Sequence, residues 1–102
     1  NGIYIPKDIN ECMTELDRLL DKESRDKFMN QEEGKAVTNA YRPGVGLWIR
    51  NNWGLWGGSR LQKYFFDKGA KDPEGISWII LTCYHRHLNG KPLDFEGQLK
   101  KS

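Results

Sequence analysis

Residues 72–90, DPEGISWIILTCYHRHLNG, contain the longest apolar run of this chain and decide its fold class. Asp72 can cap a helix, Pro73 suits the first helical position, and Glu74 suits the positive end of the helix dipole. Isoleucine, threonine and aromatic residues also favour a buried strand. The start signal and a length above ten residues nevertheless favour a helix, which Asn89-Gly90 ends. Helical spacing places five residues on one face: Ile76, Ile80, Cys83, Tyr84 and His87.

The rest of the chain carries weaker helical signals. Asp8, after Pro6, can cap a helix whose apolar residues recur at helical spacing: Ile9, Cys12, Met13, Leu16, Leu19 and Leu20. Shorter helices are expected over five further stretches: 24–29, 30–39, 47–53, 59–69 and 94–100. Asn30 and Ser59 are the expected caps of two of these helices, and Arg42-Pro43-Gly44 is expected to break the chain.

Length and composition indicate one globular domain. The chain has 102 residues, of which 37% are hydrophobic and 29% charged, and this suits a single core. We therefore predict an all-α fold, a compact single-domain bundle of about five to six short helices over residues 1–102. No apolar run is long enough for a transmembrane helix, so no membrane insertion is expected. The net charge of +2 is too small to indicate a nucleic-acid partner.

The most distinctive stretch is 44–58, GVGLWIRNNWGLWGG, which holds three of the four tryptophans and five of the eleven glycines. Such a mixture suits a tightly packed helical junction or a recognition surface built on one. Six residues are the candidate binding residues: Arg50, Asn51, Asn52, Trp53, Trp56 and Arg60. We expect Trp48 and Trp53 to be structural. Four others are expected to be partly exposed around one depression: Arg50, Asn51, Trp56 and Arg60.

Cysteine and histidine residues give one arrangement that suits catalysis or metal binding. Cys83 and His87 are four residues apart on one helical face, as in a nucleophile–base pair or half of a zinc site, and His85 points away from them. Zinc needs more ligands and the only other cysteine is Cys12, so a buried thiol and a histidine at the end of an apolar stripe are favoured. We predict no catalytic residue, no metal and no cofactor. Whether Cys12 and Cys83 form a disulfide is left open.

Three stretches resemble a family of small bacterial proteins described only as a domain of unknown function: YIPKDINECMTELDRLL, WIRNNWGLWGGSRLQKYF and DPEGISWIILTCYHRHLNGK. The resemblance runs from Tyr4 to about Leu99. Its most specific part is the W-x-R-N-N-W-x-L-W block with G-S-x-L-x-x-Y-F after it. It implies a predominantly helical fold and a bacterial origin. Some family members carry an export signal, and this chain begins Asn-Gly rather than Met. Export to the periplasm or cell envelope is therefore slightly favoured over the cytoplasm.

Two classes of function fit these observations. The first is a non-catalytic protein-binding module, for example an immunity-type protein that neutralises a partner; the partner is then another protein, and the oligomeric state stays open. Between residues 44 and 66 there are three basic and no acidic side chains, which suits an acidic partner surface. The second is a small-ligand (anion) binding domain or small enzyme, with a pocket around four residues: Arg50, Asn51, Asn52 and Arg60.

Overall fold

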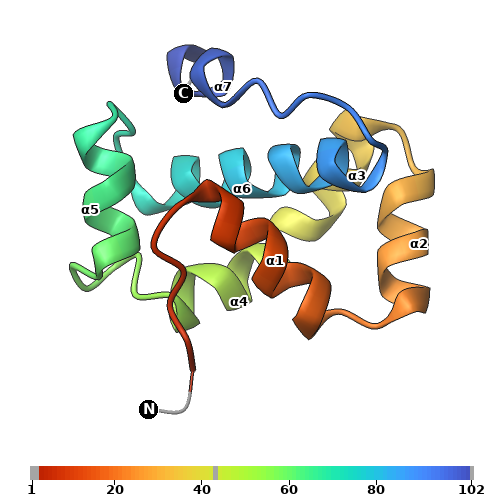
Figure 1. The fold of residues 1–102 in the computed structure, drawn as a ribbon, viewed down its shortest axis with the longest axis horizontal. Helices are drawn as coiled ribbons and strands as arrows, with labels where there is room; N and C mark the ends of the chain where they lie inside the picture. Colours follow the sequence, from red (N-terminus) through yellow and green to blue (C-terminus); the bar gives the residue numbers. More distant parts are fainter. Residues whose placement is uncertain (1–2, 43, 102) are drawn as a thin grey trace.

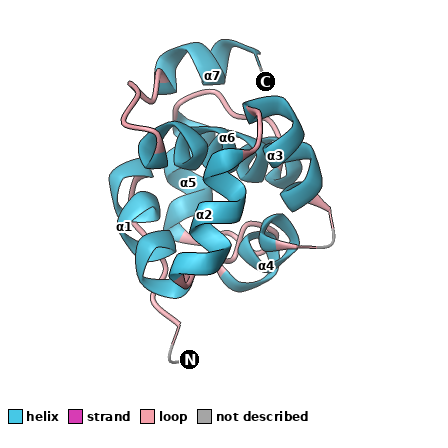
Figure 2. Cartoon of the chain, turned by 90° about the vertical axis from the view of Figure 1, so that its right-hand side faces the viewer, coloured by secondary structure: helices cyan, strands magenta, loops and turns pink. Residues whose placement is uncertain are grey.

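The fold is all-α, as the sequence predicts. The computed structural model describes residues 3–42 and 44–101, and within these ranges it contains helices and loops but no strand (Figures 1 and 2). The helices are α1 (Ile9–Leu19), α2 (Lys22–Asn30), α3 (Glu33–Tyr41), α4 (Val45–Asn52), α5 (Arg60–Asp67), α6 (Pro73–Leu88) and α7 (Phe95–Lys101). Seven helices in the described ranges exceed the five to six expected, because each of the seven stretches with a helical signal, the short ones included, forms a helix of its own.

Helix α6 is the centre of the domain. Asp72 caps it by accepting a hydrogen bond from the Gly75 backbone N–H at 2.7 Å, and Gly90 ends it at a φ of +69°. Its buried residues are Ile76, Ser77, Ile79, Ile80, Leu81, Thr82, Cys83, Tyr84 and His85. Each of the other six helices contacts α6, which runs through the middle of Figure 1 with α5 at one end and α2 at the other. The helix is therefore buried on more than the single face that the sequence pattern indicates.

The capping residues explain where most of the other helices begin. Asp8 caps α1 and Ser59 caps α5, each through a side-chain oxygen that accepts a backbone N–H, as predicted. The predicted cap at Asn30 is wrong, because Asn30 is the last residue of α2 and the Glu32 carboxylate caps α3. Of the break expected at Arg42-Pro43-Gly44, Pro43 lies outside the described residues.

Close packing joins α3 to α4. A Cβ atom on Gly46, in the first turn of α4, would overlap the backbone of Tyr41 at the end of α3. Glycine is therefore required here so that the two helices can approach each other. This packing fixes the start of α4 beside α3 and sets the position of the side chains that follow.

Candidate functional site

The tryptophan-rich stretch forms α4 and the loop after it, and its apolar residues are largely core. Trp53 and Leu55 are completely buried, and the half-buried Trp48 packs edge-on against Trp53 with ring centroids 5.9 Å apart. The expectation that Trp48 and Trp53 support the fold is confirmed. Trp53, although also a candidate binding residue, is not accessible to a partner.

Arg50 is a buried structural residue, so the expectation that it is partly exposed is wrong. Its side chain is 5% exposed, and its Nη1 atom donates a hydrogen bond to the Ser77 hydroxyl on α6 at 2.8 Å. The guanidinium carbon also lies 4.8 Å from the centre of the Tyr41 ring, within cation–π range. Arg50 therefore links α4 to α6 and α3.

Arg60 contacts a different part of the molecule. It is exposed, and its Nε and Nη2 atoms donate to the backbone oxygen of Ile5 at 3.0 and 2.6 Å, while its guanidinium lies over the Tyr4 ring. Since Arg50 binds α6 and Arg60 binds the N-terminal segment, the two guanidinium groups do not face one depression. The single depression predicted around them is wrong.

Trp56 is displayed on a well-anchored loop. Its side chain is 58% exposed, whereas the Ser59 hydroxyl donates to the Trp53 backbone oxygen at 2.8 Å and the Gln62 amide donates to that of Leu55 at 2.6 Å. The loop backbone is therefore fixed on both sides of an exposed indole. Trp56 stays a candidate contact residue.

Asn51 and Asn52 border an apolar groove between α1 and α4. The groove has a volume of about 660 Å³ and is lined by Leu16, Leu19, Leu20, Gly44, Val45, Leu47, Trp48, Asn51 and Asn52. Leu19 on one wall is 40% exposed and Leu47 on the other is 42% exposed. The Asn52 amide donates to the Trp48 backbone oxygen, whereas the Asn51 side chain makes no hydrogen bond to any residue in the described ranges. The groove thus offers apolar walls and one unpaired amide group.

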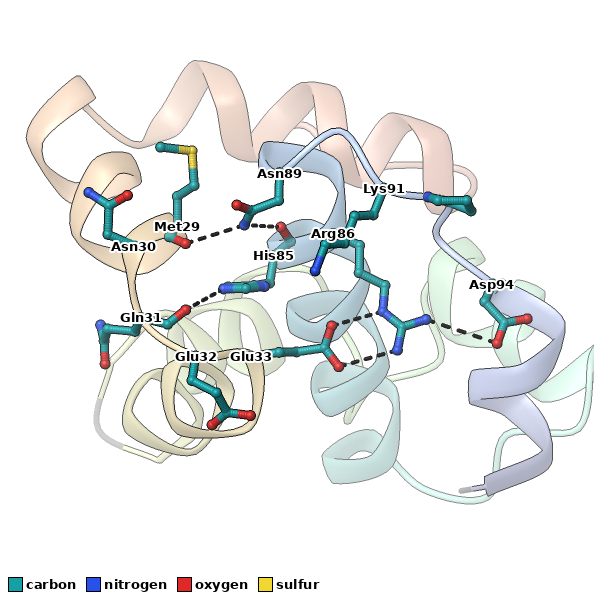
Figure 3. Close-up of a pocket in the computed structure, with 11 residues that line it drawn as sticks. Met29, Asn30, Gln31, Glu32, Glu33, His85, Arg86, Asn89, Lys91 and Asp94 are labelled. Atoms are coloured by element: carbon teal, nitrogen blue, oxygen red, sulfur yellow. Dashed lines mark hydrogen bonds and ion pairs between the residues drawn. The ribbon is translucent and has the colours of Figure 1, made fainter.

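A second, polar cleft lies where the α2–α3 turn meets the C-terminal end of α6 (Figure 3). Arg86 is at its centre: Nε lies 2.8 Å and Nη2 3.2 Å from the two carboxylate oxygens of Glu33, and Nη1 lies 3.9 Å from Asp94. The hydrogen bonds from Arg86 lower the pKa of Glu33, and those same bonds raise the pKa of Arg86. Arg86 is therefore paired within the chain and joins α3, α6 and the segment before α7.

His85 anchors the end of α2 beside that cleft. Its Nε2 donates to the backbone oxygen of Gln31 at 2.8 Å, and its Nδ1 is buried without a hydrogen-bond partner among the described residues. The Asn89 amide also donates to the Met29 backbone oxygen at 3.2 Å. These contacts hold α2 against α6. The sequence did not predict the Glu33–Arg86–Asp94 cluster, because charged residues on separate segments of the chain do not show which of them form ion pairs.

Cys83 and His87 of α6 lie in different environments. Cys12 and Cys83 are free, buried thiols, and burial raises the pKa of Cys83 to about 12 and holds that of Cys12 well above its usual range. His87 is exposed at the end of the apolar stripe, and its Nε2 lies 2.8 Å from an Asp17 carboxylate oxygen. The buried histidine is His85, because α6 is covered on several faces. Within the described ranges, no three His, Cys, Asp or Glu side chains are grouped so that they can hold a metal ion.

The comparison with known families agrees with the resemblance seen in the sequence. A model of the family described as "Domain of unknown function (DUF6794)" matches residues 5–88. The chain belongs to this family. The DUF6794 region contains α1 to α6 and all the residues of the apolar groove, while α7 lies beyond it. No curated protein and no solved structure matches the chain. Among the described helices of the DUF6794 region and of α7, none is long and apolar enough to cross a membrane.

Proposed function

We propose that this chain is a non-catalytic bacterial protein-binding module and that the groove between α1 and α4 is its binding surface. One observation carries the proposal: none of the nine groove residues is charged, and Leu19 and Leu47 are substantially exposed on opposite walls. Exposed apolar side chains that line a groove together are typical of an interaction surface. The family resemblance supports the bacterial origin.

The partner that fits this groove is an amphipathic helix of another protein. Two helices form the walls, and a third helix that lays apolar side chains between them would complete a three-helix arrangement. The uncharged walls favour leucine-like anchors, since a charged side chain here would lose water without gaining a partner. Asn51 can hydrogen-bond to the polar edge of that helix. A protein that neutralises a secreted toxin is one form of this function.

The contacts of the two arginines favour this proposal over an anion pocket. Arg50 already binds Ser77 and Arg60 already binds the Ile5 carbonyl, so an anion would have to displace intramolecular contacts on two sides of the domain. The groove requires no such rearrangement. The protein-binding function is therefore the better supported of the two expectations.

A charge placed in the groove tests the proposal. Leu47→Asp is expected to abolish binding, whereas Phe66→Asp, at a residue 40% exposed on α5 and outside the groove lining, is expected to leave it intact. Tagged wild-type and variant proteins are used for capture from the native host. The captured protein is then identified, purified and titrated calorimetrically against all three. Equal affinity for Leu47→Asp and Phe66→Asp would show that the groove is not the binding surface.

A further inference from the structure

An aromatic recess lies where the end of α3 meets the first turns of α6. It is lined by Tyr41, Asp72, Glu74, Gly75 and Trp78, none of which is basic. The Trp78 side chain is 38% exposed, and it packs edge-to-face with the half-buried Tyr41 ring at a centroid distance of 5.1 Å. The recess thus combines two aromatic rings with two carboxylates, and it shares no lining residue with the groove between α1 and α4.

The two carboxylates of the recess are exposed and unpaired. One oxygen of Asp72 accepts the Gly75 backbone N–H at 2.7 Å, as the cap of α6. Neither Asp72 nor Glu74 forms an ion pair with any residue in the described ranges, and the Glu74 carboxylate accepts no hydrogen bond from them. The positive end of the helix dipole favours acids at both positions but does not neutralise them. Their negative charge is therefore available to a ligand.

We propose that this recess binds the guanidinium group of an arginine side chain carried by another protein. A guanidinium group stacks on an aromatic face while its N–H groups pair with a carboxylate, so one ligand group can use both Trp78 and Glu74. These two residues are four positions apart on α6 and lie on one face of the helix. Gly75, which has no side chain, adds no bulk beside them.

The chain contains a contact of the same kind behind the recess. The Arg50 guanidinium carbon lies 4.8 Å from the centre of the Tyr41 ring, and the Arg50 side chain is buried. Arg50 therefore occupies the inner side of the aromatic pair, and the exposed Trp78 ring is left for a ligand. The positive charge of Arg50 opposes a second cation, whereas the carboxylates of Asp72 and Glu74 attract one.

The exposure of the recess favours a side chain of a protein over a free small molecule. Asp72, Glu74 and Trp78 are all exposed, so the recess is open to solvent. A small-molecule site covers most of its ligand, and an open recess does not. An arginine side chain needs only its planar head covered, because the rest of its chain can lie over the surrounding surface. The two carboxylates also repel nucleic acids and anionic lipids. This inference goes beyond the proposed groove and does not depend on it.

A pair of isosteric ligands tests the charge requirement. N-acetyl-arginine methylamide carries the arginine side chain on a peptide backbone, and the citrulline derivative has the same shape without the charge. Each is titrated into the protein while nitrogen–proton NMR follows the Trp78 indole N–H, which is assigned from its loss in Trp78→Phe. The arginine derivative is expected to give a saturable shift in the millimolar range, and the citrulline derivative none. Equal shifts from both would overturn the proposal.

Glu74 provides the matched pair of protein variants. Glu74→Gln keeps the shape of the side chain and is expected to weaken binding of the arginine derivative at least about threefold, as for an exposed ion pair. Glu23 is also a first-turn acid, on α2 and outside the recess, so Glu23→Gln is expected to leave the affinity unchanged. Circular dichroism checks that both variants are folded. Equal affinity of the two variants would show that Glu74 serves only the end of its helix, and would overturn the proposal.

Two further ligands test the identity of the occupant. The lysine derivative is expected to bind more weakly than the arginine derivative, and equal affinity would overturn the choice of a guanidinium group. Free arginine is expected to bind no more tightly than its derivative. Tighter binding of free arginine would make a small molecule the occupant and overturn the protein partner. Leu47→Asp, in the groove, is expected to bind the arginine derivative as wild type does, so the two proposals fail or succeed separately.

Discussion

Replacing Arg50 with alanine should destabilise the domain far more than replacing its neighbour Asn51. The two residues are adjacent on α4, yet Arg50 is buried and binds Ser77 and the Tyr41 ring, whereas Asn51 is exposed. The Arg50→Ala change removes a charged hydrogen-bond donor and leaves a gap between three helices. The Asn51→Ala change removes a side chain without an intramolecular hydrogen bond to the described residues.

The size of the effect follows from the contacts that are lost. A hydrogen bond from a charged donor contributes about 1.5–3 kcal/mol, and a cation–π contact contributes about 1 kcal/mol. Ser77 keeps its own bond to the Glu74 backbone oxygen, so no further penalty arises there. We expect the Arg50→Ala change to lower the free energy of unfolding by about 3 kcal/mol, which for a domain of this size lowers Tm by roughly 12–24 °C. For Asn51→Ala we expect a change within about 0.5 kcal/mol.

Urea denaturation followed by tryptophan fluorescence measures both values, since Trp53 is buried in the core. Ser77→Ala and the double variant Arg50→Ala with Ser77→Ala complete a thermodynamic cycle that isolates the hydrogen bond. A coupling energy near zero would show that the Arg50–Ser77 bond does not stabilise the fold. Equal destabilisation by Arg50→Ala and Asn51→Ala would refute the assignment of Arg50 as a structural residue.

Three further perturbations have defined outcomes. Gly46→Ala should lower the free energy of unfolding by more than about 2 kcal/mol in urea titrations, because the added Cβ overlaps the end of α3. At the control position, Gly57→Ala, no atom lies within 4 Å of the new Cβ, so the free energy of unfolding should change by less than about 1 kcal/mol. The Arg86 guanidinium depresses the pKa of Glu33 below its ordinary value of 4.5. The stability that this pair contributes is therefore present above pH 4.5 and is lost as the pH falls through the lower pKa of the folded state. Urea midpoints measured between about pH 2.5 and 7 should show a smaller loss of stability on the acid side for Glu33→Gln than for wild type. The Cys83 thiol should react with a disulfide reagent at pH 8 only after unfolding in urea, because it is buried and its pKa is raised to about 12; a rapid reaction in the native state would contradict this.

The sequence predicted the parts of the fold that depend on neighbouring residues. The caps at Asp8, Ser59 and Asp72 act within one helical turn, and all three begin helices as expected. The predicted cap at Asn30 is wrong because the residue that caps α3 is Glu32, and glutamate is not among the residues usually preferred over Asn30 at this position. Local pattern cannot decide between them when the preceding helix continues to Asn30.

The parts that could not be predicted depend on residues far apart in the chain. Arginine is seldom buried, and nothing near Arg50 indicates that Ser77, 27 residues later, would accept its hydrogen bond. The groove was missed for the same reason, because Leu19 and Leu47 belong to two helices that only the fold brings together. The burial of His85 could not be predicted, since an amphipathic pattern describes one buried face and α6 has more than one.

The central position of α6 also has a consequence for the order of folding during synthesis. All the other helices contact α6, yet α1 to α5 precede it in the chain and span residues 9–67. A ribosome therefore releases five short helices before their common partner, and helices of this length are marginal in water on their own. The native arrangement becomes accessible only once residues 73–88 have emerged. Until then the leucines of α1 and Trp48 of α4 must be kept from aggregating by the nascent chain itself or by chaperones.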